Sequence, residues 1–342
     1  MRYKLLGKSG LRVSELALGT MTFGEDWGWG ASWEESRKIF DAFANAGGNF
    51  VDTAINYTNG TAEQFVGDFI AADREHFVVA TKYTLNTRRD DANAGGNQRK
   101  NMVQSVEKSL KRLKTDYIDL YWLHVWDFTT PLEEILRGFD DLVRAGKVLY
   151  VGISDSPAWV IAQMVTMAEW RGWSRPVAIQ LPYNLAGRSP ERELFPMARA
   201  LDLAVTCWGL IGGGVLTGKY NQPTAEAKRY GDAPISQRTQ AIVAEIAKVA
   251  EESGRSKAQV AINWVRQQQP KAQIIPILGA RTEQQISDNL ACLEWELTPE
   301  QLQRLSAAAK IELGFPSDFL ADDEVQDLIF GNMVGKIDNH RR

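Results

Sequence analysis

Several features common in other protein classes are scarce or absent from this sequence of 342 residues. It has only two cysteines, Cys207 and Cys292, which are too few for a disulfide framework. It has no apolar run long enough to cross a bilayer, and its first residues, 1–4, lack the apolar core of a signal peptide. The formal net charge is −4, the pI is about 5.6, and no long basic run is present. We therefore expect a soluble, cytoplasmic protein that binds neither nucleic acid nor membranes.

Motifs of several enzyme classes are also missing. We find no cluster with zinc-ligand spacing, no G-x-G-x-x-G and no G-x-S-x-G, so the sequence predicts no metal site, no Rossmann dinucleotide fold and no serine hydrolase. Residues 213–219 match the G-x-x-x-x-G-K core of a P-loop. The next residue is Tyr220 rather than the serine or threonine that would bind Mg²⁺, which disfavours an NTPase.

What the sequence does contain is a regular alternation of short apolar segments and amphipathic ones. The apolar segments are typical of parallel strands buried on both faces, and they lie at 15–20, 50–51, 77–82, 117–122, 147–153, 177–181, 203–208 and 273–277. An open doubly wound sheet and a barrel both fit this alternation. The count of eight and the even spacing favour an α/β (β/α)₈ TIM barrel.

Additional segments are expected at both ends of this barrel. Residues 4–6 and 11–13 flank a glycine-containing turn and predict an N-terminal β-hairpin. An extra C-terminal helix is predicted to begin near Pro299, and a tail from about residue 311 shows little regular pattern. No linker interrupts the chain, so we assign residues 1–342 to a single domain.

Four polar residues stand at or just beyond the carboxyl ends of predicted strands, where TIM barrels place their chemistry: Asp52, Tyr57, Lys82 and His124. Each has an ordinary explanation when it is taken alone. Lys82 could be solvated, Asp52 could cap a loop, and His124 could be a hydrogen-bonded structural residue. The combination is harder to dismiss, because a barrel brings these strand ends together.

The four residues suit the reduction of a carbonyl group. Hydride addition to a carbonyl creates an alkoxide, so a proton donor must lie within hydrogen-bond reach of the oxygen. Tyr57 is the candidate donor, and an ammonium on Lys82 would lower its pKa from the usual value of about 10. Asp52 would hold Lys82 in place, and His124 would orient and polarise the carbonyl.

Several motifs together carry a resemblance to a known family. They are residues 18–21, 52–54 with Tyr57, 80–82, 119–124, 145–148, 152–154, 213–220 and 279–281 with Gln285 and Asn289. On these residues the chain resembles the aldo-keto reductase superfamily, and in particular members like aryl-alcohol dehydrogenases and potassium-channel β-subunits. The resemblance implies a (β/α)₈ barrel that reduces aldehydes and ketones with NADPH and without a metal, using Asp52, Tyr57, Lys82 and His124 as catalytic residues.

The resemblance also implies an NADP(H) site. Ser154 and Gln180 match positions that hold the nicotinamide carboxamide, and Trp208 matches the ring that stacks on the nicotinamide. Other matching positions lie near the ribose, the pyrophosphate or the adenosine; the cofactor-binding set is Gly19, Thr20, Met21, Asp52, Ser154, Asp155, Gln180, Trp208, Leu210, Gly212, Lys219, Gly279, Arg281, Gln285 and Asn289. The Arg281 guanidinium suits a 2′-phosphate and favours NADP over NAD.

Two positions depart from the family pattern. Asp155 stands where asparagine is usual, and a carboxylate can accept a hydrogen bond from a carboxamide NH₂ but cannot donate one to its oxygen. Residues 207–209 read Cys-Trp-Gly where an aromatic residue followed by Ser-Pro is common. Both departures place the strength of cofactor binding in question.

The substrate is less well determined by the sequence. Trp27, Trp29, Trp126 and Phe128 fall in loops over the predicted barrel mouth, where they could line an apolar pocket for aryl or alkyl carbonyls or simply pack the loops together. The tail, with Phe315, Phe319 and Phe330, could add a wall to this pocket or be buried for stability. Oligomerisation and the physiological substrate stay open.

Two rival functions are carried forward. One is a regulatory or redox-sensing subunit that binds NADPH and turns it over slowly, as some channel-associated relatives do. The other is a barrel lyase in which Lys82 forms a Schiff base with its substrate.

Overall fold

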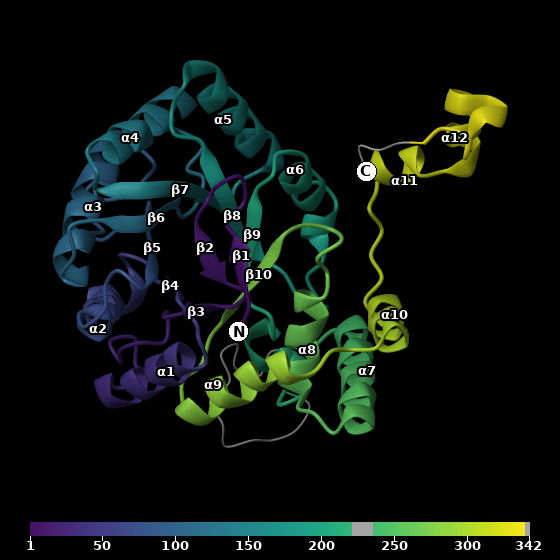
Figure 1. Ribbon diagram of the computed structural model, residues 1–342, viewed down its shortest axis with the longest axis horizontal. Coiled ribbons are helices and arrows are strands. Elements are labelled where there is room, and N and C mark those ends of the chain that lie inside the picture. Colours follow the sequence, from purple (N-terminus) through teal and green to yellow (C-terminus); the bar gives the residue numbers. More distant parts are fainter. Residues whose placement is uncertain (221–234, 339–342) are drawn as a thin grey trace.

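The computed structural model describes residues 1–220 and 235–338, and its centre is a closed barrel of eight parallel strands (Figure 1). The strands follow one another around the barrel in sequence order, and the last pairs with the first. They are β3 (Ala17–Gly19), β4 (Phe50–Asp52), β5 (Val78–Tyr83), β6 (Ile118–Leu123), β7 (Val148–Ser154), β8 (Pro176–Pro182), β9 (Ala204–Trp208) and β10 (Ile274–Leu278). The predicted (β/α)₈ barrel is confirmed, with each strand within a few residues of its expected position.

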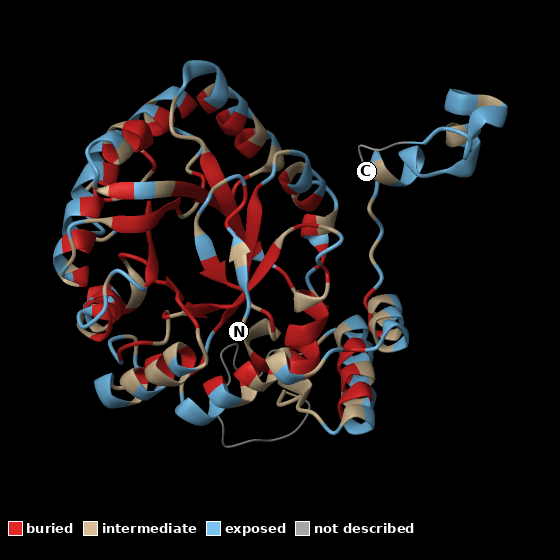
Figure 2. Cartoon of the chain, viewed as in Figure 1, coloured by how far each residue is buried: buried red, intermediate tan, exposed pale blue. Residues whose placement is uncertain are grey.

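Helices surround the barrel and bury their apolar stripes against the outer face of the strands (Figure 1). They are α1 (Trp33–Asn45), α2 (Thr61–Ile70), α3 (Arg99–Leu113), α4 (Leu132–Arg144), α5 (Ala158–Arg171), α6 (Leu194–Ala200), α7 (Gln237–Ser253), α8 (Lys257–Arg266) and α9 (Glu283–Leu290). In Figure 2 the barrel strands are almost entirely buried, whereas most of the helices are buried on their inner faces. Helix α8 differs, because all of its residues 259–265 are buried. No helix in the described part of the chain is both long and apolar enough to cross a membrane.

The barrel interior is filled by side chains that alternate along each strand with outward-facing ones. On β4 the inward residue Phe50 precedes the outward Val51, and on β6 Leu120 and Trp122 point inward on either side of Tyr121. This period of two fixes which residues at the strand ends can reach the barrel axis.

The predicted N-terminal hairpin is present, and it closes one end of the barrel. It consists of β1 (Tyr3–Leu5) and β2 (Arg12–Ser14), and its residues Leu6 and Val13 are fully buried in the interior cluster. Lys8 N donates to Asp202 O at 2.8 Å, just before β9 begins. The hairpin therefore covers the amino ends of the strands and leaves the carboxyl ends for a site.

The chain beyond α9 contains one predicted helix and two unpredicted ones. Helix α10 (Pro299–Ala308) packs on α7, where Arg304 binds Glu245 and Glu252. The tail that follows forms two short helices, α11 (Ser317–Leu320) and α12 (Asp323–Phe330), where the sequence shows little regular pattern.

The tail extends away from the barrel (Figure 1), and neither expectation for it is right. Among the described residues, hydrogen bonds made by residues 314–338 stay within that segment. The tail is largely exposed (Figure 2). Phe315, Phe319 and Phe330 are among its exposed residues, so they neither line the barrel mouth nor enter the core. The sequence shows that these residues are apolar. It does not show what they pack against, because that depends on tertiary contacts.

Candidate active site

The predicted catalytic residues converge at the carboxyl ends of β4, β5 and β6. Asp52 is two residues after the inward-facing Phe50 and Lys82 is two after Ala80, so the alternation directs both side chains into the barrel. His124 follows β6 with the same alternation, and its ring centroid lies 6.0 Å from that of Tyr57. The tetrad expected from the sequence is therefore one spatial cluster.

Lys82 is the centre of this cluster. Its side chain is fully buried, and its ammonium donates to Asp52 Oδ2 at 2.5 Å, to Thr53 O at 2.7 Å and to Tyr57 Oη at 3.2 Å. Three acceptors satisfy all three N–H groups of an ammonium. The lysine is thus fixed between the carboxylate and the phenol.

The charge on Lys82 is retained despite burial. Desolvation by itself lowers the pKa of this lysine, but the carboxylate of Asp52 and the phenol of Tyr57 more than offset that effect, and the pKa is raised. Lys82 is accordingly an ammonium throughout the physiological pH range.

The pKa of Tyr57 differs from the sequence expectation. Burial raises the pKa of its phenol, the nearby charge of Lys82 lowers it, and Asp52 raises it; the net result is a pKa above the usual value of 10. The contribution of Lys82 has the expected sign, but desolvation of the phenolate outweighs it. Tyr57 therefore carries its proton at neutral pH, as a proton donor must.

His124 is held as a neutral imidazole. Burial, helped by the positive charge of Lys82, lowers its pKa to about 3. Its Nδ1 atom is buried without a hydrogen-bond partner, and its backbone N donates to Thr84 Oγ1 at 3.2 Å. A neutral imidazole can donate one hydrogen bond to a carbonyl oxygen without competing with Tyr57 for the proton.

A buried ion pair behind the loop of Tyr57 was not foreseen from the sequence. Glu63 on α2 is fully buried; it accepts from Thr81 Oγ1 at 2.7 Å and from Arg112 Nη1 at 3.0 Å. The same Arg112 nitrogen donates to Ile55 O at 2.8 Å, two residues before Tyr57. These partners are 18 to 57 residues apart in the chain, so no local sequence motif predicts their contacts.

A second unpredicted network supports His124 from the other side. The Asn97 side chain is fully buried and donates to Thr84 Oγ1 and to Val125 O, both at 2.9 Å. Asp127 Oδ2 accepts from Asn97 N at 2.7 Å. Asn97 thereby connects the long polar loop to Val125, which follows His124 in the chain, and to Thr84, whose hydroxyl accepts from the His124 backbone.

Unsatisfied polar atoms gather around the tetrad. Within the described part of the chain, seven buried side-chain polar atoms lack a hydrogen-bond partner, and all but Ser109 Oγ lie at or next to these strand ends: Thr53 Oγ1, Asn56 Oδ1, Trp122 Nε1, His124 Nδ1, Trp126 Nε1 and Ser154 Oγ. Such atoms are rare in folded proteins and mark places where a ligand or water completes the bonding. The cluster fits a site that binds a polar molecule.

The residues expected around the nicotinamide carboxamide lie beside the tetrad. Ser154 and Gln180 are paired in register on β7 and β8 and are both buried. Gln180 Nε2 donates to Asp52 Oδ1 at 2.9 Å, which leaves its Oε1 as the atom that can accept from a carboxamide NH₂. With the unpartnered Ser154 hydroxyl, the pair offers one donor and one acceptor, which is what a carboxamide requires.

The residues expected at the other end of the cofactor occupy the carboxyl ends of β9, β10 and β3. Thr20 N donates to Asp52 O at 3.0 Å, and β3 pairs with β10, so Gly19, Thr20 and Met21 lie between the tetrad and the segment of Gly279 and Arg281. Gln285 Oε1 accepts from Arg281 N at 2.9 Å, and Asn289 Nδ2 donates to Gly279 O at 3.3 Å.

The glycine-rich segment after β9 lies over the same end of the barrel. Leu210 is buried and Gly212 begins a 3₁₀ turn, η3 (Gly212–Thr217). The Lys219 side chain runs directly along Gly214, where a Cβ atom would lie 2.3 Å from Lys219 Cε. The cation is thereby folded back over the turn, and the adjoining residues 221–234 lie outside the described part of the chain.

The four aromatic residues expected at the mouth form two pairs. Trp27 and Trp29 have ring centroids 5.7 Å apart, and Trp126 and Phe128 have centroids 6.2 Å apart in an edge-to-face arrangement. Trp126 is 9% exposed and Phe128 is 78% exposed. Each pair packs its own loop, and Phe128 also offers an open apolar surface.

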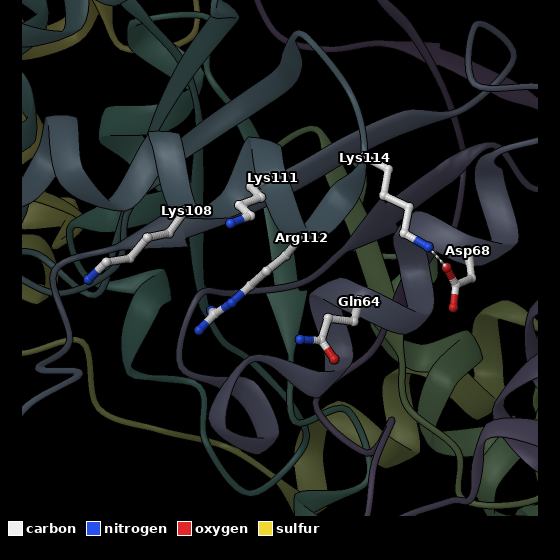
Figure 3. Close-up of a pocket in the computed structure, with 6 residues that line it drawn as sticks. All are labelled: Gln64, Asp68, Lys108, Lys111, Arg112 and Lys114. Carbon is white, nitrogen blue, oxygen red and sulfur yellow. Dashed lines mark hydrogen bonds and ion pairs between the residues drawn. The ribbon is translucent and has the colours of Figure 1, made fainter.

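A groove elsewhere on the surface is separate from this cluster. It lies between α2 and α3 and is lined by Gln64, Asp68, Lys108, Lys111, Arg112 and Lys114 (Figure 3). Lys114 forms an ion pair with Asp68, and Arg112 points inward to Glu63. The tetrad residues do not line it, so this groove is not the candidate active site.

Comparison with known proteins identifies the family of the chain. A profile of the Aldo/keto reductase family matches residues 15–310. The chain is 35% identical over 328 residues to a norsolorinic acid reductase of Emericella nidulans, covering 93% of this chain and 84% of that protein. It is also 35% identical over 343 residues to the aryl-alcohol dehydrogenase [NADP(+)] of Phanerodontia chrysosporium, covering 94% and 89%. The chain therefore belongs to the aldo/keto reductase family and is an oxidoreductase of that family.

Proposed function

We propose that this protein reduces aldehydes and ketones to alcohols with NADPH, reversibly, and that Tyr57 donates the proton. The observation that carries this proposal is the position of Lys82, whose buried ammonium joins the Asp52 carboxylate to the Tyr57 hydroxyl. A carbonyl gains a hydride at carbon and a proton at oxygen when it becomes an alcohol, and the cluster provides a protonated phenol for the second event.

Each side chain of the tetrad has a distinct task in this proposal. Tyr57 gives up its proton to the developing alkoxide, and the adjacent Lys82 ammonium stabilises the phenolate that is left. Asp52 keeps Lys82 charged and in place. His124, which is neutral and partly buried, donates a hydrogen bond that orients the carbonyl oxygen.

The residues present fit a nicotinamide cofactor. When bound, NADPH supplies the hydride. Ser154 and Gln180 would hold its carboxamide, Trp208 would stack on its ring, and Lys219 and Arg281 would pair with its phosphates, with the remaining contacts from Gly19, Thr20, Met21, Asp155, Leu210, Gly212, Gly279, Gln285 and Asn289. The unpartnered Ser154 hydroxyl supports this assignment, and the name of the 35%-identical NADP(+) relative supports NADP over NAD.

An aromatic carbonyl is the proposed substrate class. The aromatic pairs Trp27–Trp29 and Trp126–Phe128 offer flat apolar surfaces of the kind that ring systems stack on. The names of the relatives, aryl-alcohol dehydrogenase and norsolorinic acid reductase, point in the same direction.

The geometry of Lys82 disfavours the lyase alternative. Formation of a Schiff base requires an unprotonated amine with a free lone pair. Lys82 is fully buried with three hydrogen-bond acceptors around it, and its pKa is raised. It is built as a fixed cation rather than as a nucleophile.

The decisive test is turnover of NADPH with a panel of aryl and alkyl aldehydes and ketones, followed by nicotinamide absorbance and repeated with NADH. We expect oxidation of NADPH that depends on the carbonyl, with aryl substrates favoured. Tyr57→Phe should reduce turnover by at least about 100-fold while the Kd for NADPH changes little, because only the proton donor is lost.

A matched control is Tyr3→Phe, which makes the same chemical change on the hairpin at the opposite end of the barrel. It should leave turnover unchanged. Normal turnover in Tyr57→Phe would show that another group donates the proton, and NADPH binding without measurable turnover in the unmodified protein would favour a regulatory subunit.

A further inference from the structure

The C-terminal tail carries an apolar face that the rest of the described chain leaves exposed. On α12, Val325, Leu328 and Ile329 follow the spacing i, i+3, i+4, so they form one apolar stripe along the helix. Leu328 and Ile329 are exposed, and the hydrogen bonds of residues 314–338 stay within that segment. A helix of this length is marginal in water by itself, so we expect the stripe to pack against a partner surface.

The same part of the tail is acidic. Residues 317–330, which include α11 and α12, contain five carboxylates and no basic residue: Asp318, Asp322, Asp323, Glu324 and Asp327. In the part of the chain that the structure describes, none of the five forms an ion pair, and Asp318 and Asp322 accept hydrogen bonds from backbone N–H groups of the tail. Glu324 and Asp327 lie beside the apolar stripe at the spacing i, i+3. The partner surface should therefore be basic as well as able to take apolar side chains.

The groove between α2 and α3 has both of these properties (Figure 3). Its volume is about 490 Å³, within the range of pockets that accept a drug-sized molecule, so it has room for a few side chains. Lys108, Lys111 and Arg112 follow the spacing i, i+3, i+4 on α3 and form its basic wall. Arg112 is paired with Glu63, whereas Lys108 and Lys111 have no carboxylate partner among the described residues. Lysine stems are aliphatic, so they can cover apolar side chains while their ammonium groups stay in water.

The tail is too short to reach this groove on its own chain. Helices α2 and α3 follow β4 and β5, whereas the tail leaves the barrel near α6 and α7, on the opposite side of the closed ring of strands (Figure 1). Its last attachment to the barrel is the hydrogen bond from Arg192 Nη2 to Glu312 O, at 3.0 Å. Residues 312–323 span at most about 40 Å when fully extended. A domain of about 300 residues is roughly 50 Å across, so a path around half its surface is roughly 80 Å long.

We propose that α12 of one copy of this chain docks in the α2–α3 groove of a second copy, and that the exchange is reciprocal and gives a two-fold symmetric dimer. The apolar stripe of α12 packs on the aliphatic stems of Lys108 and Lys111, as an amphipathic helix does in a groove. Glu324 and Asp327 pair with the two ammonium groups, since both the acids and the lysines are spaced i, i+3. Reciprocal exchange makes each contact twice and leaves no tail or groove free to extend the assembly.

The expected association is weak and depends on salt. One short helix in one groove is a small contact even when it is made twice, so we expect a dimer Kd of roughly 10–100 µM. A more dilute solution should contain the monomer, in which the tail packs against nothing. The ion pairs are exposed at the rim of the groove, so raising the ionic strength from about 0.05 to 0.5 M should raise the Kd several-fold.

The test is sedimentation velocity of the full-length protein between about 1 and 300 µM, which spans the expected Kd. Reversing the groove charges with Lys108→Glu/Lys111→Glu should raise the Kd at least about tenfold, because it places like charges opposite each other. Reversing the tail charges with Glu324→Lys/Asp327→Lys should do the same. A chain that carries all four substitutions restores opposite charges across the contact, and its Kd should return to within about threefold of the unmodified value.

The matched control is Lys38→Glu/Lys248→Glu. It reverses two exposed lysines on α1 and α7, outside the α2–α3 groove, and should leave the Kd unchanged. The four-site variant also separates loss of charge pairing from loss of α12 itself, because a tail that no longer forms the helix would not regain binding. Urea denaturation of each variant at low concentration checks that the barrel is folded.

Three results would overturn the inference. The first is the mass of a single chain at every concentration, whether the tail then stays free, folds onto its own barrel or binds an unrelated protein. The second is a dimer that neither charge reversal weakens, which would place the interface elsewhere. The third is a four-site variant that stays as weak as the two-site variants, which would show that α12 does not pair with α3. None of these results bears on the proposed carbonyl reduction, because no residue of the tetrad is changed.

Discussion

At the scale of single residues, burial determines the chemistry of the tetrad. Lys82 and His124 are both basic side chains within one cluster, yet one is a permanent cation and the other is neutral. The difference arises because Lys82 contacts the Asp52 carboxylate, whereas His124 has no acid partner and is repelled by Lys82. The tetrad therefore presents a protonated phenol on Tyr57 beside an imidazole that is neutral at neutral pH.

A prediction at this scale concerns His124. Its pKa is about 3 in the folded protein, well below the ordinary value of 6.5, so the unfolded chain takes up a proton first as pH falls. The stability that this histidine contributes is present above pH 6.5 and is lost as pH falls below it. His124→Gln should thus reduce the loss of unfolding free energy between pH 6.5 and 4.5 by about 2 kcal/mol, measured by urea denaturation.

The exposed His76 offers a control for that measurement. It lies in the turn before β5, so His76→Gln makes the same substitution at an exposed position outside the tetrad. In kinetic assays, no ionisation of His124 should appear between pH 5 and 8. An inflection near pH 6.5 that disappears in His124→Gln would contradict the neutral imidazole.

At the scale of elements, the turn that carries Tyr57 depends on its packing against α3. The 3₁₀ turn η1 (Tyr57–Gly60) contains two residues with left-handed backbone, Thr58 and Asn59, and Gly60 follows with φ of +103°. A Cβ atom on Gly60 would lie 2.3 Å from Arg112 Cζ. Since Arg112 also binds Ile55 O and Glu63, the glycine, the ion pair and the position of Tyr57 are linked.

Gly60→Ala should therefore damage both stability and rate. We expect a loss of about 2 kcal/mol in unfolding free energy, from backbone strain and from displacement of the Arg112 guanidinium, and a fall in turnover of more than about tenfold. Urea denaturation and NADPH oxidation measure the two effects.

Gly146→Ala separates the effect of backbone strain from the effect of displacing the Arg112 guanidinium. Gly146 has φ of +70° in the turn between α4 and β7, and a Cβ atom there would contact nothing within 4 Å. That variant should lose about 1 kcal/mol and keep normal turnover. Equal effects of the two variants on turnover would show that Arg112 does not position Tyr57.

At the scale of the whole molecule, the hairpin closes the barrel at the amino ends of the strands, and α10 is the last helix that packs on the barrel domain. Arg188 Nη1 donates to Ala309 O at 3.1 Å and Arg192 Nη2 donates to Glu312 O at 3.0 Å, so the chain is attached to the barrel as far as that residue. Beyond it, the tail is largely exposed (Figure 2). Its exposed apolar side chains are Phe315, Phe319, Leu320, Leu328, Ile329, Phe330, Met333, Val334 and Ile337. The tail therefore contributes little packing to the barrel.

A prediction at this scale compares two leucines. Leu328→Gln, at a side chain that is 85% exposed, should change the unfolding free energy by no more than about 0.5 kcal/mol. Leu305→Gln, at a fully buried position on α10, should cost about 3 kcal/mol or more. Thermal and urea unfolding measure both, and a large effect of Leu328→Gln would show that the tail packs against the barrel.

The sequence by itself determined the barrel and much of its candidate site. Eight apolar segments separated by amphipathic ones leave few folds open, and the alternation along each strand directs Asp52, Lys82 and His124 into the barrel. These properties follow from local patterns, because the period of the apolar side chains indicates whether a segment is a strand or a helix and which of its faces is buried.

Only the tertiary structure decided the energetics of those residues and the roles of several others. The pKa of Tyr57 is raised by burial and by groups that are distant in the chain, and the ion pair of Arg112 and Glu63 joins residues from two different helices. The exposure of the tail is likewise invisible in its composition. Solvation and charge pairing depend on which atoms surround a group, and a linear sequence does not state its neighbours in space.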